Sequence, residues 1–378
     1  MKLKFGMVGG GNGAFIGAFH RQGAVMDDLA ELTAGCFSRR WDKNLECAET
    51  WGVRDSARVY HDYEEMARAE GARADGIDFV SIVTPNSTHY PAAKAFLSQG
   101  IHVVCDKPLT MTVAEAEELR QLAQDRGLLF AVTYTYAGYA IIRQAREMVE
   151  AGAIGKLLHV RAEFPQEWFI VSKEAGVNEQ AAWRLDKSQA GESGCTADMC
   201  THIEHLVAAM CGLHPERVLA QFDFCLGHTL ENNVNVLVKY PGGATGTLWA
   251  SQIATGHELD LSVELFGEKG SLRWKHGDSN AVWYTPVDQP PQYITLGRRY
   301  TCPESRRLMR GIPGAPVGYA EAFGNIYRSF MQALLARKAG EEDNSYTYPT
   351  VTDGVWGMKF INACLQSHRE GNVWVGLG

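Results

Sequence analysis

The sequence predicts two domains: an α/β domain built on a doubly wound parallel sheet, followed by an α+β domain with a large, mostly antiparallel open sheet. Two observations carry this prediction. Apolar, strand-like runs alternate with helix-like segments as far as residue 132, a pattern typical of parallel sheets covered on both faces. Beyond that residue, short strand-like runs follow one another with turns between them. We therefore divide the 378-residue chain into domains 1–132 and 133–378.

The first domain is predicted element by element. Residues 79–83 are an apolar, β-branched run of the kind that is buried on both faces of a sheet. Thr112 and Glu115 are spaced as a capping box at the start of a helix. Pro91 stands where a first-turn proline would begin another helix. We expect strands over 3–9, 32–37, 79–83, 101–105 and 128–132, and helices over 14–22, 41–51, 91–99 and 112–126.

The second domain has a different pattern. Pro-Gly-Gly at 241–243 is a turn signal between two strand-like runs, which predicts a hairpin. Residues 285–318 hold six of the thirteen prolines, and we expect an irregular excursion there. We expect strands over 157–164, 218–226, 233–240, 244–252, 259–266 and 271–274, and helices over 141–151, 197–210, 319–338 and 352–368.

Composition limits the function classes. A net charge of -8 gives no basic surface for nucleic acid. No run of about 18 apolar residues exists to span a membrane, and the first residues meet glycines where a signal peptide would continue its apolar core. The nine cysteines are scattered and odd in number, as in reduced intracellular proteins. We expect a cytoplasmic protein that binds neither nucleic acid nor membrane.

The junction of the first strand and the first helix is rich in glycine, and the candidate site residues there are Gly9, Gly11, Gly13 and Gly17. Glycines let backbone amides approach a pyrophosphate, and the helix N-terminus favours negative charge there. Gly9 and Gly11 fit the G-x-G-x-x-G fingerprint of Rossmann domains, but the next helix-side glycine is Gly17, so the loop is longer than usual. A dinucleotide site is the interpretation that the β-α-β context favours over a flexible turn.

The end of the second strand indicates which nucleotide is bound. An NAD site usually has an acid here for the ribose 2′-hydroxyl, but between the end of this strand and Asp42 the sequence has no acid. Ser38, Arg39 and Arg40 stand there instead, and arginine suits a 2′-phosphate. Two exposed arginines that simply start a helix are the alternative. We expect NADP to be preferred, with NAD as the alternative cofactor.

Lys107 follows a predicted strand of the parallel sheet, in Asp106-Lys107-Pro108. Ligands bind at the carboxyl ends of such strands, and Pro108 disfavours helical geometry at Lys107. A lysine there can hydrogen-bond a substrate hydroxyl or donate a proton. A solvated surface lysine is the alternative.

Asp198 and His202 are four residues apart in a predicted helix and so share one of its faces. An aspartate beside a histidine stabilises the imidazolium, which suits a general base for an alcohol proton. A local helix-stabilising pair is one alternative. A zinc site made from His202, His205, Cys195 or Cys200 is another, but no recognisable ligand spacing accompanies them, and we expect no metal.

These features, in this order, resemble the Gfo/Idh/MocA family of glucose–fructose oxidoreductases and inositol dehydrogenases. The motifs are the glycine loop, Thr84-Pro85-Asn86-Ser87-Thr88-His89, Asp106-Lys107-Pro108 and Asp198-x-x-x-His202. The family usually has Glu-Lys-Pro where this chain has Asp-Lys-Pro. The stretches 9–20 and 318–323 resemble one subgroup of the family, so the resemblance covers most of the chain.

The resemblance implies an NAD(P)-dependent dehydrogenase or reductase acting on a hydroxyl or keto carbon of a sugar or polyol. It implies catalytic roles for Lys107, Asp198 and His202. It also implies contacts with the cofactor or substrate, which involve Thr84, Pro85, Asn86, His89, Trp183 and Arg184. An NAD-dependent glycoside hydrolase and a non-catalytic cofactor-binding sensor remain as alternatives. We expect a homodimer or homotetramer formed through the open face of the second sheet, with apolar positions in 233–238 and 259–266.

Overall fold

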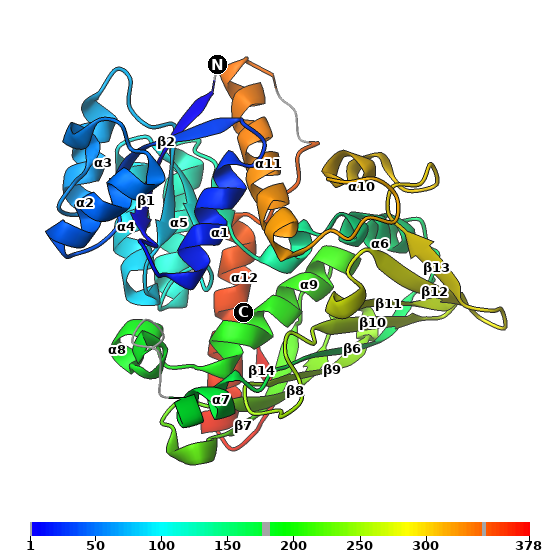
Figure 1. Cartoon of the computed structure of the whole chain (residues 1–378). Coiled ribbons are helices and arrows are strands. Elements are labelled where there is room, and N and C mark those ends of the chain that lie inside the picture. Colours follow the sequence, from blue (N-terminus) through cyan, green and yellow to red (C-terminus); the bar gives the residue numbers. More distant parts are fainter. Residues whose placement is uncertain (1, 176–181, 342–344) are drawn as a thin grey trace. The chain divides into compact units, whose positions relative to one another are not determined.

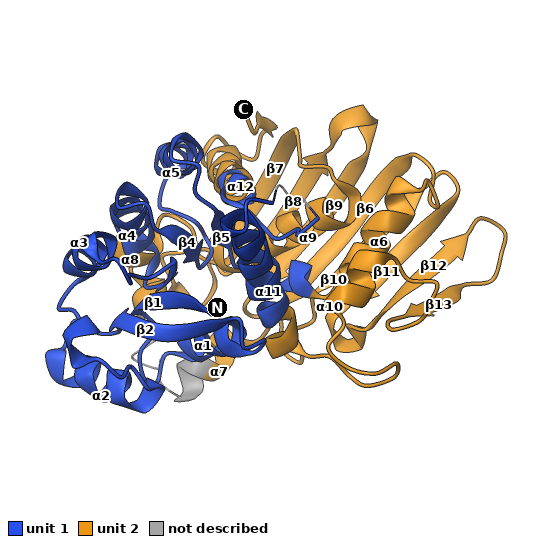
Figure 2. Cartoon of the chain, turned by 90° about the horizontal axis from the view of Figure 1, so that it is seen from above, with its two compact units in different colours: residues 1–138, 323–355 blue, residues 139–322, 356–378 orange. Residues whose placement is uncertain are grey.

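The computed structural model describes residues 2–175, 182–341 and 345–378, and the chain forms two compact units (Figures 1 and 2). Unit 1 comprises Met1–Gly138 and Phe323–Val355, and unit 2 comprises Tyr139–Ala322 and Trp356–Gly378. A division into two consecutive stretches does not anticipate that residues 323–355 belong with the N-terminal unit. They do so because Tyr327 and Phe330 pack on Phe79, with ring centroids 6.4 and 5.3 Å apart.

Unit 1 is built on a five-stranded sheet in the order β2-β1-β3-β4-β5, and every neighbouring pair is parallel, as predicted. The strands are β1 (Leu3–Gly9), β2 (Ala30–Cys36), β3 (Phe79–Val83), β4 (His102–Cys105) and β5 (Phe130–Val132). A parallel bridge from Gly35 to Val59 extends the sheet beyond β2. The order reverses between β1 and β3, and ligands of doubly wound sheets bind outside the carboxyl ends of the strands at such a point.

Helices cover both faces of this sheet. Phe5 and Phe79 stack on the face that α11 covers, whereas a side chain at Gly6 would overlap Met66 of α3 on the other face. Burial on both sides explains why β3 is apolar throughout. The helices are α1 (Phe15–Val25), α2 (Trp41–Trp51), α3 (Tyr63–Ala72), α4 (Asn86–Ser98), α5 (Val113–Asp125) and α11 (Tyr319–Lys338).

Two details of unit 1 differ from the sequence prediction. Helix α4 begins at Asn86, so Pro91 lies inside the helix and not in its first turn. The proline lacks an N–H, which removes one helical hydrogen bond but does not end the helix. Helix α3 was not predicted, although the Asp62 side chain accepts a hydrogen bond from the Glu65 N–H and caps its start.

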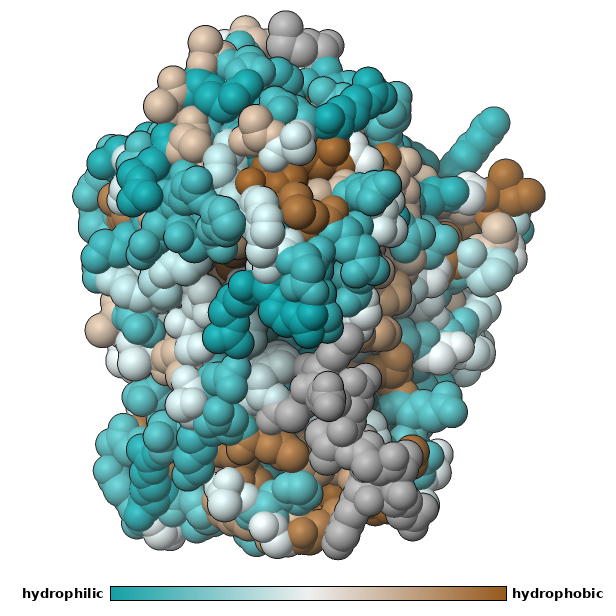
Figure 3. Space-filling model, turned by 60° about the vertical axis from the view of Figure 1, so that its left-hand side comes forward, coloured by the Kyte–Doolittle hydropathy of each residue, from teal (hydrophilic) through white to brown (hydrophobic). Residues whose placement is uncertain are grey.

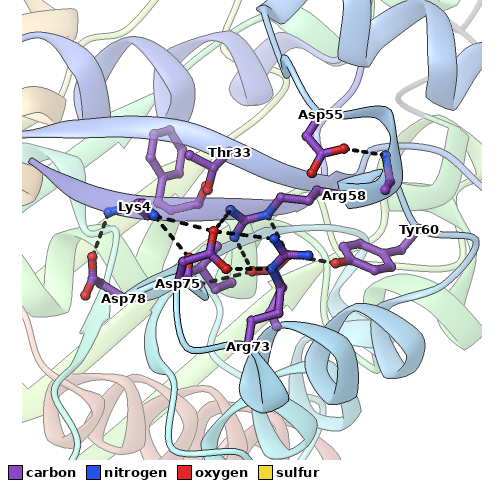
Figure 4. A network of polar contacts seen from close by, with 12 residues as sticks. Lys4, Thr33, Asp55, Arg58, Tyr60, Arg73, Asp75 and Asp78 are labelled. Carbon is purple, nitrogen blue, oxygen red and sulfur yellow. Dashed lines mark hydrogen bonds and ion pairs between the residues drawn. The ribbon is translucent and has the colours of Figure 1, made fainter.

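A buried ion pair fixes the segment beside β2 (Figure 4). The Arg58 guanidinium pairs with the Glu70 carboxylate of α3, which also accepts a hydrogen bond from the Tyr60 hydroxyl at 2.7 Å. The Ile77 N–H donates to the same carboxylate at 3.1 Å. Because both charged side chains are at most 5% exposed, loss of Arg58 would leave the Glu70 carboxylate as an uncompensated buried charge.

Unit 2 is built on a nine-stranded sheet in the order β13-β12-β11-β10-β6-β9-β8-β7-β14. The pair β6–β9 is parallel and the other neighbours are antiparallel, which confirms the mostly antiparallel prediction. The strands are β6 (Leu157–Pro165), β7 (Arg217–Asp223), β8 (Asn233–Lys239), β9 (Thr245–Ser251), β10 (Ser262–Gly267), β11 (Gly270–Lys275), β12 (Ala281–Pro286), β13 (Gln292–Thr295) and β14 (Val375–Gly376).

The stretch 285–318, predicted to be irregular, contains regular elements. Strand β13 lies in this stretch and pairs antiparallel with residues 281–284 of β12, and α10 (Pro303–Leu308) follows. The Pro290-Pro291 pair lies in the turn between the two strands, where prolines remove no ladder hydrogen bond. The prolines therefore mark turns and a helix start in this stretch.

Helices cover one face of the second sheet, and α6 and α9 lie across it in Figure 2. In β8, Val234, Val236 and Val238 are buried, whereas Leu237 on the opposite face is 45% exposed. This alternation is typical of a sheet with one open face. The helices of this part of the chain are α6 (Ala140–Glu150), α7 (Trp168–Ala175), α8 (Lys187–Ala190), α9 (Thr201–Cys211) and α12 (Val351–Arg369).

Hydrophilic side chains dominate the face drawn in Figure 3, where hydrophobic residues form separate small patches. Within the described ranges, no helix combines the length and the hydropathy that a membrane span requires.

Candidate active site

The glycine loop lies at the carboxyl end of β1, beside the switch point of the parallel sheet. Gly9 and Gly13 have φ values of 76° and 88°, which side chains rarely adopt. A Cβ at Gly17 would overlap the Gly10 carbonyl, and one at Gly11 would lie 2.9 Å from the Phe37 carbonyl oxygen. No side chain caps the start of α1 at Ala14. The loop therefore brings bare backbone and an uncapped helix N-terminus together, as a pyrophosphate requires.

The end of β2 is held by a buried asparagine that the sequence did not single out. Asn44, fully buried, accepts a hydrogen bond from the Phe37 N–H and donates to the Tyr60 carbonyl, both at 2.7 Å. These bonds fix the backbone that leads into Ser38 and Arg39. The position of the loop after β2 is therefore supported by contacts within the fold.

The two arginines after β2 differ in their contacts. The Arg40 guanidinium lies 2.5 Å from the Asp42 carboxylate, and this hydrogen bond lowers the pKa of Asp42 from its ordinary value. Arg39 is exposed, and no carboxylate of the described ranges lies within ion-pair distance of it. The Ser38 hydroxyl accepts a hydrogen bond from the Arg40 N–H at 3.2 Å. Arg39 is thus the arginine whose charge is not already engaged.

Asp106 anchors the backbone of Lys107. Its Oδ1 accepts hydrogen bonds from the Lys107 N–H at 2.9 Å and the Thr133 hydroxyl at 2.7 Å. His20 Nε2 lies 3.8 Å from the same oxygen. Burial alone would raise the pKa of Asp106, but the neighbouring side chains of His20, Lys107 and His89 bring it well below its usual range. Asp106 is therefore held as a carboxylate.

A buried network continues from Asp106 into α11. His20 Nδ1 lies 2.7 Å from the Tyr327 hydroxyl, which lies 2.8 Å from the Ser81 hydroxyl. His20, Ser81 and Tyr327 are fully buried. Sequence reasoning missed this network, because its members come from α1, β3 and α11 and form no motif. It ties the lysine loop to the core of unit 1.

His89 connects the two loops at this edge of the sheet. Its Nδ1 lies 2.9 Å from the Pro108 carbonyl oxygen, and its Nε2 lies 2.9 Å from the Thr84 carbonyl oxygen. Burial lowers the pKa of His89. The structure therefore brings the Thr84–His89 motif and the Asp106–Pro108 motif together, with Pro85 and Asn86 at the start of α4 between them.

In unit 2, the Asp198 segment is a π-helix (Thr196–Cys200) that continues into α9. Short π-helical segments occur often at functional sites. The half-buried Asp198 accepts a hydrogen bond from the Gln252 amide at 3.1 Å. His202 is 7% exposed, and its ring centroid lies 6.3 Å from that of Phe164 in β6. Asp198 and His202 thus lie on one element over the covered face of the second sheet.

The structure bears on the zinc site that was an alternative for this segment. Burial raises the pKa of both the Cys195 and the Cys200 thiols, so neither favours the thiolate form that binds zinc. Across residues 2–175, 182–341 and 345–378, no three His, Cys, Asp or Glu side chains gather as a metal site would require. Of the other predicted contact residues, the Arg184 guanidinium lies 4.7 Å from the centre of the Trp183 ring.

Two further residues support this segment and were also missed. The Glu231 carboxylate is buried at the start of the π-helix, and Gln252 follows β9 directly. Both lie far from residues 194–205 in the sequence, and the register of the sheet brings them there. The spacing of residues within one helix cannot predict partners that come from distant strands.

Comparison with known proteins identifies the family. The family model described as an oxidoreductase family with an NAD-binding Rossmann fold matches residues 3–134, and the GFO/IDH/MocA C-terminal domain matches residues 142–273. An uncharacterized oxidoreductase of Bacillus subtilis is 34% identical over 99% of this chain and 96% of its own length. Levoglucosan dehydrogenase of Pseudarthrobacter phenanthrenivorans is 28% identical over 79% of this chain and 80% of its own.

A solved structure supports the same assignment. The inositol dehydrogenase homolog of Azotobacter vinelandii complexed with NAD+ has a TM-score of 0.95 and 34% identity, covering 100% of this chain and 97% of that one. In a second structure, the homolog holds NADH and myo-inositol, and the TM-score is 0.92 at 33% identity, with 100% and 98% covered. The chain is therefore a member of the GFO/IDH/MocA family of NAD-binding oxidoreductases.

Proposed function

We propose that this protein is a dehydrogenase that transfers a hydride between a nicotinamide cofactor and a hydroxyl or keto carbon of a sugar- or polyol-like substrate. The observation that carries the proposal is the fixed position of Lys107. It leaves the carboxyl end of β4, in the same unit as the glycine loop, and Asp106 holds its backbone. An amine is thus supplied at the edge of a nucleotide-binding sheet where substrates meet the cofactor.

The chain's own residues fit a dinucleotide. The pyrophosphate would lie on the backbone of Gly9, Gly11, Gly13 and Gly17, where added side chains would collide with backbone atoms or meet an unfavourable φ. Thr84, Pro85, Asn86 and His89, with Asp106 and Pro108, would line the nicotinamide end. Trp183 and Arg184 are further contact residues under this proposal. The nicotinamide, when bound, supplies the hydride chemistry at its C4.

The acid–base roles go to three side chains. His202 takes the hydroxyl proton during oxidation, and Asp198 stabilises the imidazolium that forms. Lys107 donates a hydrogen bond to the same substrate oxygen and shares the proton transfer. In the reduction direction the protons move the opposite way. Two of these residues are held by hydrogen bonds: Asp106 accepts from the Lys107 backbone N–H, and Gln252 donates to the Asp198 carboxylate.

The relatives point to the substrate class. The Azotobacter vinelandii homolog was solved with myo-inositol, and the Pseudarthrobacter relative is a levoglucosan dehydrogenase. Both compounds carry several hydroxyl groups on a six-membered ring. A ring polyol or sugar is therefore the class that we propose for this chain, in sugar or polyol metabolism.

We also propose that NADP is preferred over NAD. Ser38 and Arg39 stand where a 2′-phosphate would lie, and the nearest acid, Asp42, is paired with Arg40. A D-xylose 1-dehydrogenase of Haloarcula marismortui, 29% identical over 65% of this chain, is named for NADP, whereas the Azotobacter vinelandii structures hold NAD+ or NADH. The preference thus varies among relatives, and Arg39 is our basis for choosing.

We propose a homodimer or homotetramer that buries the open face of the second sheet. The apolar residues expected there are divided between the faces: Val236 and Leu265 point to the covered face, whereas Leu237 and Phe266 are 45% and 37% exposed. Light scattering at micromolar concentration tests this, with Leu237→Lys as the variant expected to weaken assembly. A monomeric wild-type mass contradicts the proposal.

A substrate panel tests the function. The purified protein is mixed with ring polyols and sugars together with NAD+ or NADP+, and with their keto forms together with NADH or NADPH, and absorbance at 340 nm is followed. A rise with a polyol or sugar supports a dehydrogenase. Release of sugar from a glycoside without net absorbance change would instead show a glycoside hydrolase that uses NAD transiently. Cofactor binding with no turnover on the whole panel would favour a sensor.

A further inference from the structure

Two residues at one end of the second sheet reach the Asp198 segment: Glu231, which precedes β8, and Gln252, which follows β9. Gln252 comes directly after β9 and is 2% exposed. Its backbone N–H donates to the Asn232 carbonyl at 2.9 Å, and its carbonyl accepts from the Phe169 N–H at 3.1 Å. Because both backbone groups are engaged, the direction in which the side chain leaves the strand is fixed.

The Gln252 side chain reaches the proposed acid–base pair directly. Its Nε2 donates a hydrogen bond to Asp198 Oδ2 at 3.1 Å. An amide N–H is a donor to a carboxylate oxygen, so this bond favours the ionised form of Asp198. It also restricts the rotation of the carboxylate.

The helix that carries Asp198 is itself fixed by Glu231. One carboxylate oxygen of this 1% exposed residue accepts from the Ser193 hydroxyl at 2.7 Å and the Thr196 N–H at 3.0 Å. The other accepts from the Gly194 N–H at 2.9 Å. Glu231 therefore occupies the amides at the start of the π-helix, as a capping carboxylate does.

The charges around Asp198 oppose one another. Glu231 is a neighbouring carboxylate and disfavours a second negative charge, whereas His202 on the next turn favours it when protonated. Burial, with the charges of Glu231, Cys200 and Asp198, raises the pKa of Cys195, so that thiol stays neutral. A donor amide at 3.1 Å is thus a contact whose support for the Asp198 charge does not depend on pH.

We propose that Gln252 is a positioning residue that keeps Asp198 ionised and correctly oriented for proton transfer by His202. This inference rests on the proposed function, because it gives Asp198 an acid–base role. Gln252 itself touches neither substrate nor cofactor in the proposed mechanism. It acts through Asp198.

The first test observes Asp198 without any turnover. Protein labelled with ¹³C at the aspartate carboxyl groups is titrated by NMR, and the Asp198 signal is identified by its absence in Asp198→Asn. In Gln252→Leu, the midpoint of that signal should rise by about half a pH unit or more, because a donor to the charged form is gone. In Glu231→Gln, it should fall, because a neighbouring negative charge is gone. An unchanged midpoint in Gln252→Leu overturns the proposal.

Two variants complete the design. Gln221→Leu replaces an exposed glutamine of the same sheet and should leave the Asp198 signal as in the wild type. Gln252→Glu keeps the shape but replaces the donor with an acid, and it should raise the midpoint further than leucine does. It also serves if Gln252→Leu does not fold. A midpoint that moves equally in Gln221→Leu, or that stays unchanged in Gln252→Glu, contradicts the proposal.

The second test uses myo-inositol as the probe substrate, with NAD+ and NADP+ in parallel. If Gln252 acts on the charge of Asp198, the acid-side fall of kcat/KM in Gln252→Leu shifts to higher pH. The variant then loses a larger fraction of wild-type kcat/KM at low pH than at high pH. A merely structural role lowers kcat/KM by the same factor at every pH and would overturn the proposal. Wild-type turnover in Asp198→Asn would instead refute the proposed function, and the NMR midpoints would still decide what Gln252 does to Asp198.

Discussion

The two units fix their proposed functional groups in different ways. In unit 1, the glycine loop and Lys107 follow the carboxyl ends of β1 and β4, so the parallel sheet places them at one edge. In unit 2, Asp198 and His202 lie on a helix over an antiparallel sheet, and buried side chains at the start of β8 and the end of β9 hold that helix. The first arrangement follows from topology, whereas the second depends on individual contacts.

This difference predicts where substitutions do most harm. Groups placed by strand ends keep their position when a neighbouring side chain is lost. Groups placed by buried polar contacts, such as that of Gln252 with Asp198, move or change charge when one partner is replaced. The sequence shows the first kind of site and conceals the second.

Replacement of Lys107 should have the largest effect. In Lys107→Ala, kcat should fall about 10²–10⁴-fold, because a group that transfers a proton and binds the reacting oxygen is lost. Cofactor affinity, measured by fluorescence quenching or calorimetry, should change little, since the glycine loop is intact. Lys156→Ala, on unit 2 before β6, is the matched control and should keep wild-type turnover. Normal turnover in Lys107→Ala would show that Lys107 has no catalytic role, although it follows the carboxyl end of a parallel strand.

For unit 1, the sequence carried most of the fold. The strand at 79–83, the capping box at Thr112 and the glycine loop each depend on local chemistry that a short window contains. The structure shows Gly17 packed against Gly10, which accounts for the lengthened fingerprint. The contribution of α11 was out of reach, because Tyr327 pairs with His20 across more than three hundred residues of sequence.

For unit 2, the Asp198–His202 pair could be predicted from the sequence, but the side chains that support it could not. The four-residue spacing of Asp198 and His202 is visible, but the π-helix around Asp198 has no sequence signature. Glu231 was unremarkable as one acid among 44 aspartates and glutamates, and only the register of β8 shows that it caps this helix. Long-range hydrogen bonds to main-chain amides carry no periodicity, so pattern reasoning cannot find them.

The stability of the protein should fall at acid pH because of His102 in unit 1. Burial, with the charge of Arg337, lowers the pKa of His102 to about 4 from an ordinary 6.5. Between these values the unfolded chain binds the proton and the folded chain does not, so stability is complete above about pH 6.5 and falls as the pH drops toward 4. The loss should reach at most about 3 kcal/mol.

Urea unfolding at several pH values measures this loss. His102→Asn should flatten the slope between about pH 6.5 and 4, whereas His159→Asn, on the open face of the second sheet, should keep it. His89, also buried with a lowered pKa, adds to the same trend in unit 1. An acid slope that survives His102→Asn unchanged would place the sensitive group elsewhere.

A pair of glycine substitutions compares the two units directly. In Gly17→Ala the new Cβ would overlap the Gly10 carbonyl, and in Gly194→Ala it would lie 2.6 Å from the Glu231 carbonyl oxygen. Each should cost about 1–3 kcal/mol of stability. Gly17→Ala should weaken cofactor binding, whereas Gly194→Ala should spare it and lower turnover. Gly277→Ala, with open space around its Cβ, is the control. Equal loss of cofactor affinity in both variants would contradict the proposal that unit 1 binds the cofactor and unit 2 supplies the acid–base pair.

The smallest effect concerns the cofactor phosphate in unit 1. Arg39 is exposed, so a contact with a 2′-phosphate is partly screened by water and salt. We expect Arg39→Ala to weaken NADP about three- to tenfold and NAD hardly at all, since a tenfold change corresponds to about 1.4 kcal/mol. Arg40→Ala should do less, because the Arg40 guanidinium is already paired with Asp42.

Asp42→Asn tests the same preference for NADP over NAD in the opposite direction. Removing the carboxylate releases Arg40 and takes a negative charge from the neighbourhood of the phosphate, so NADP binding should strengthen while NAD binding stays constant. Dissociation constants for both nucleotides at low and at physiological salt measure the effect, which should shrink as salt rises. If the wild-type protein binds NAD as well as NADP or better, Arg39 does not hold a phosphate. The loop after β2 would then select its nucleotide through groups other than the two arginines.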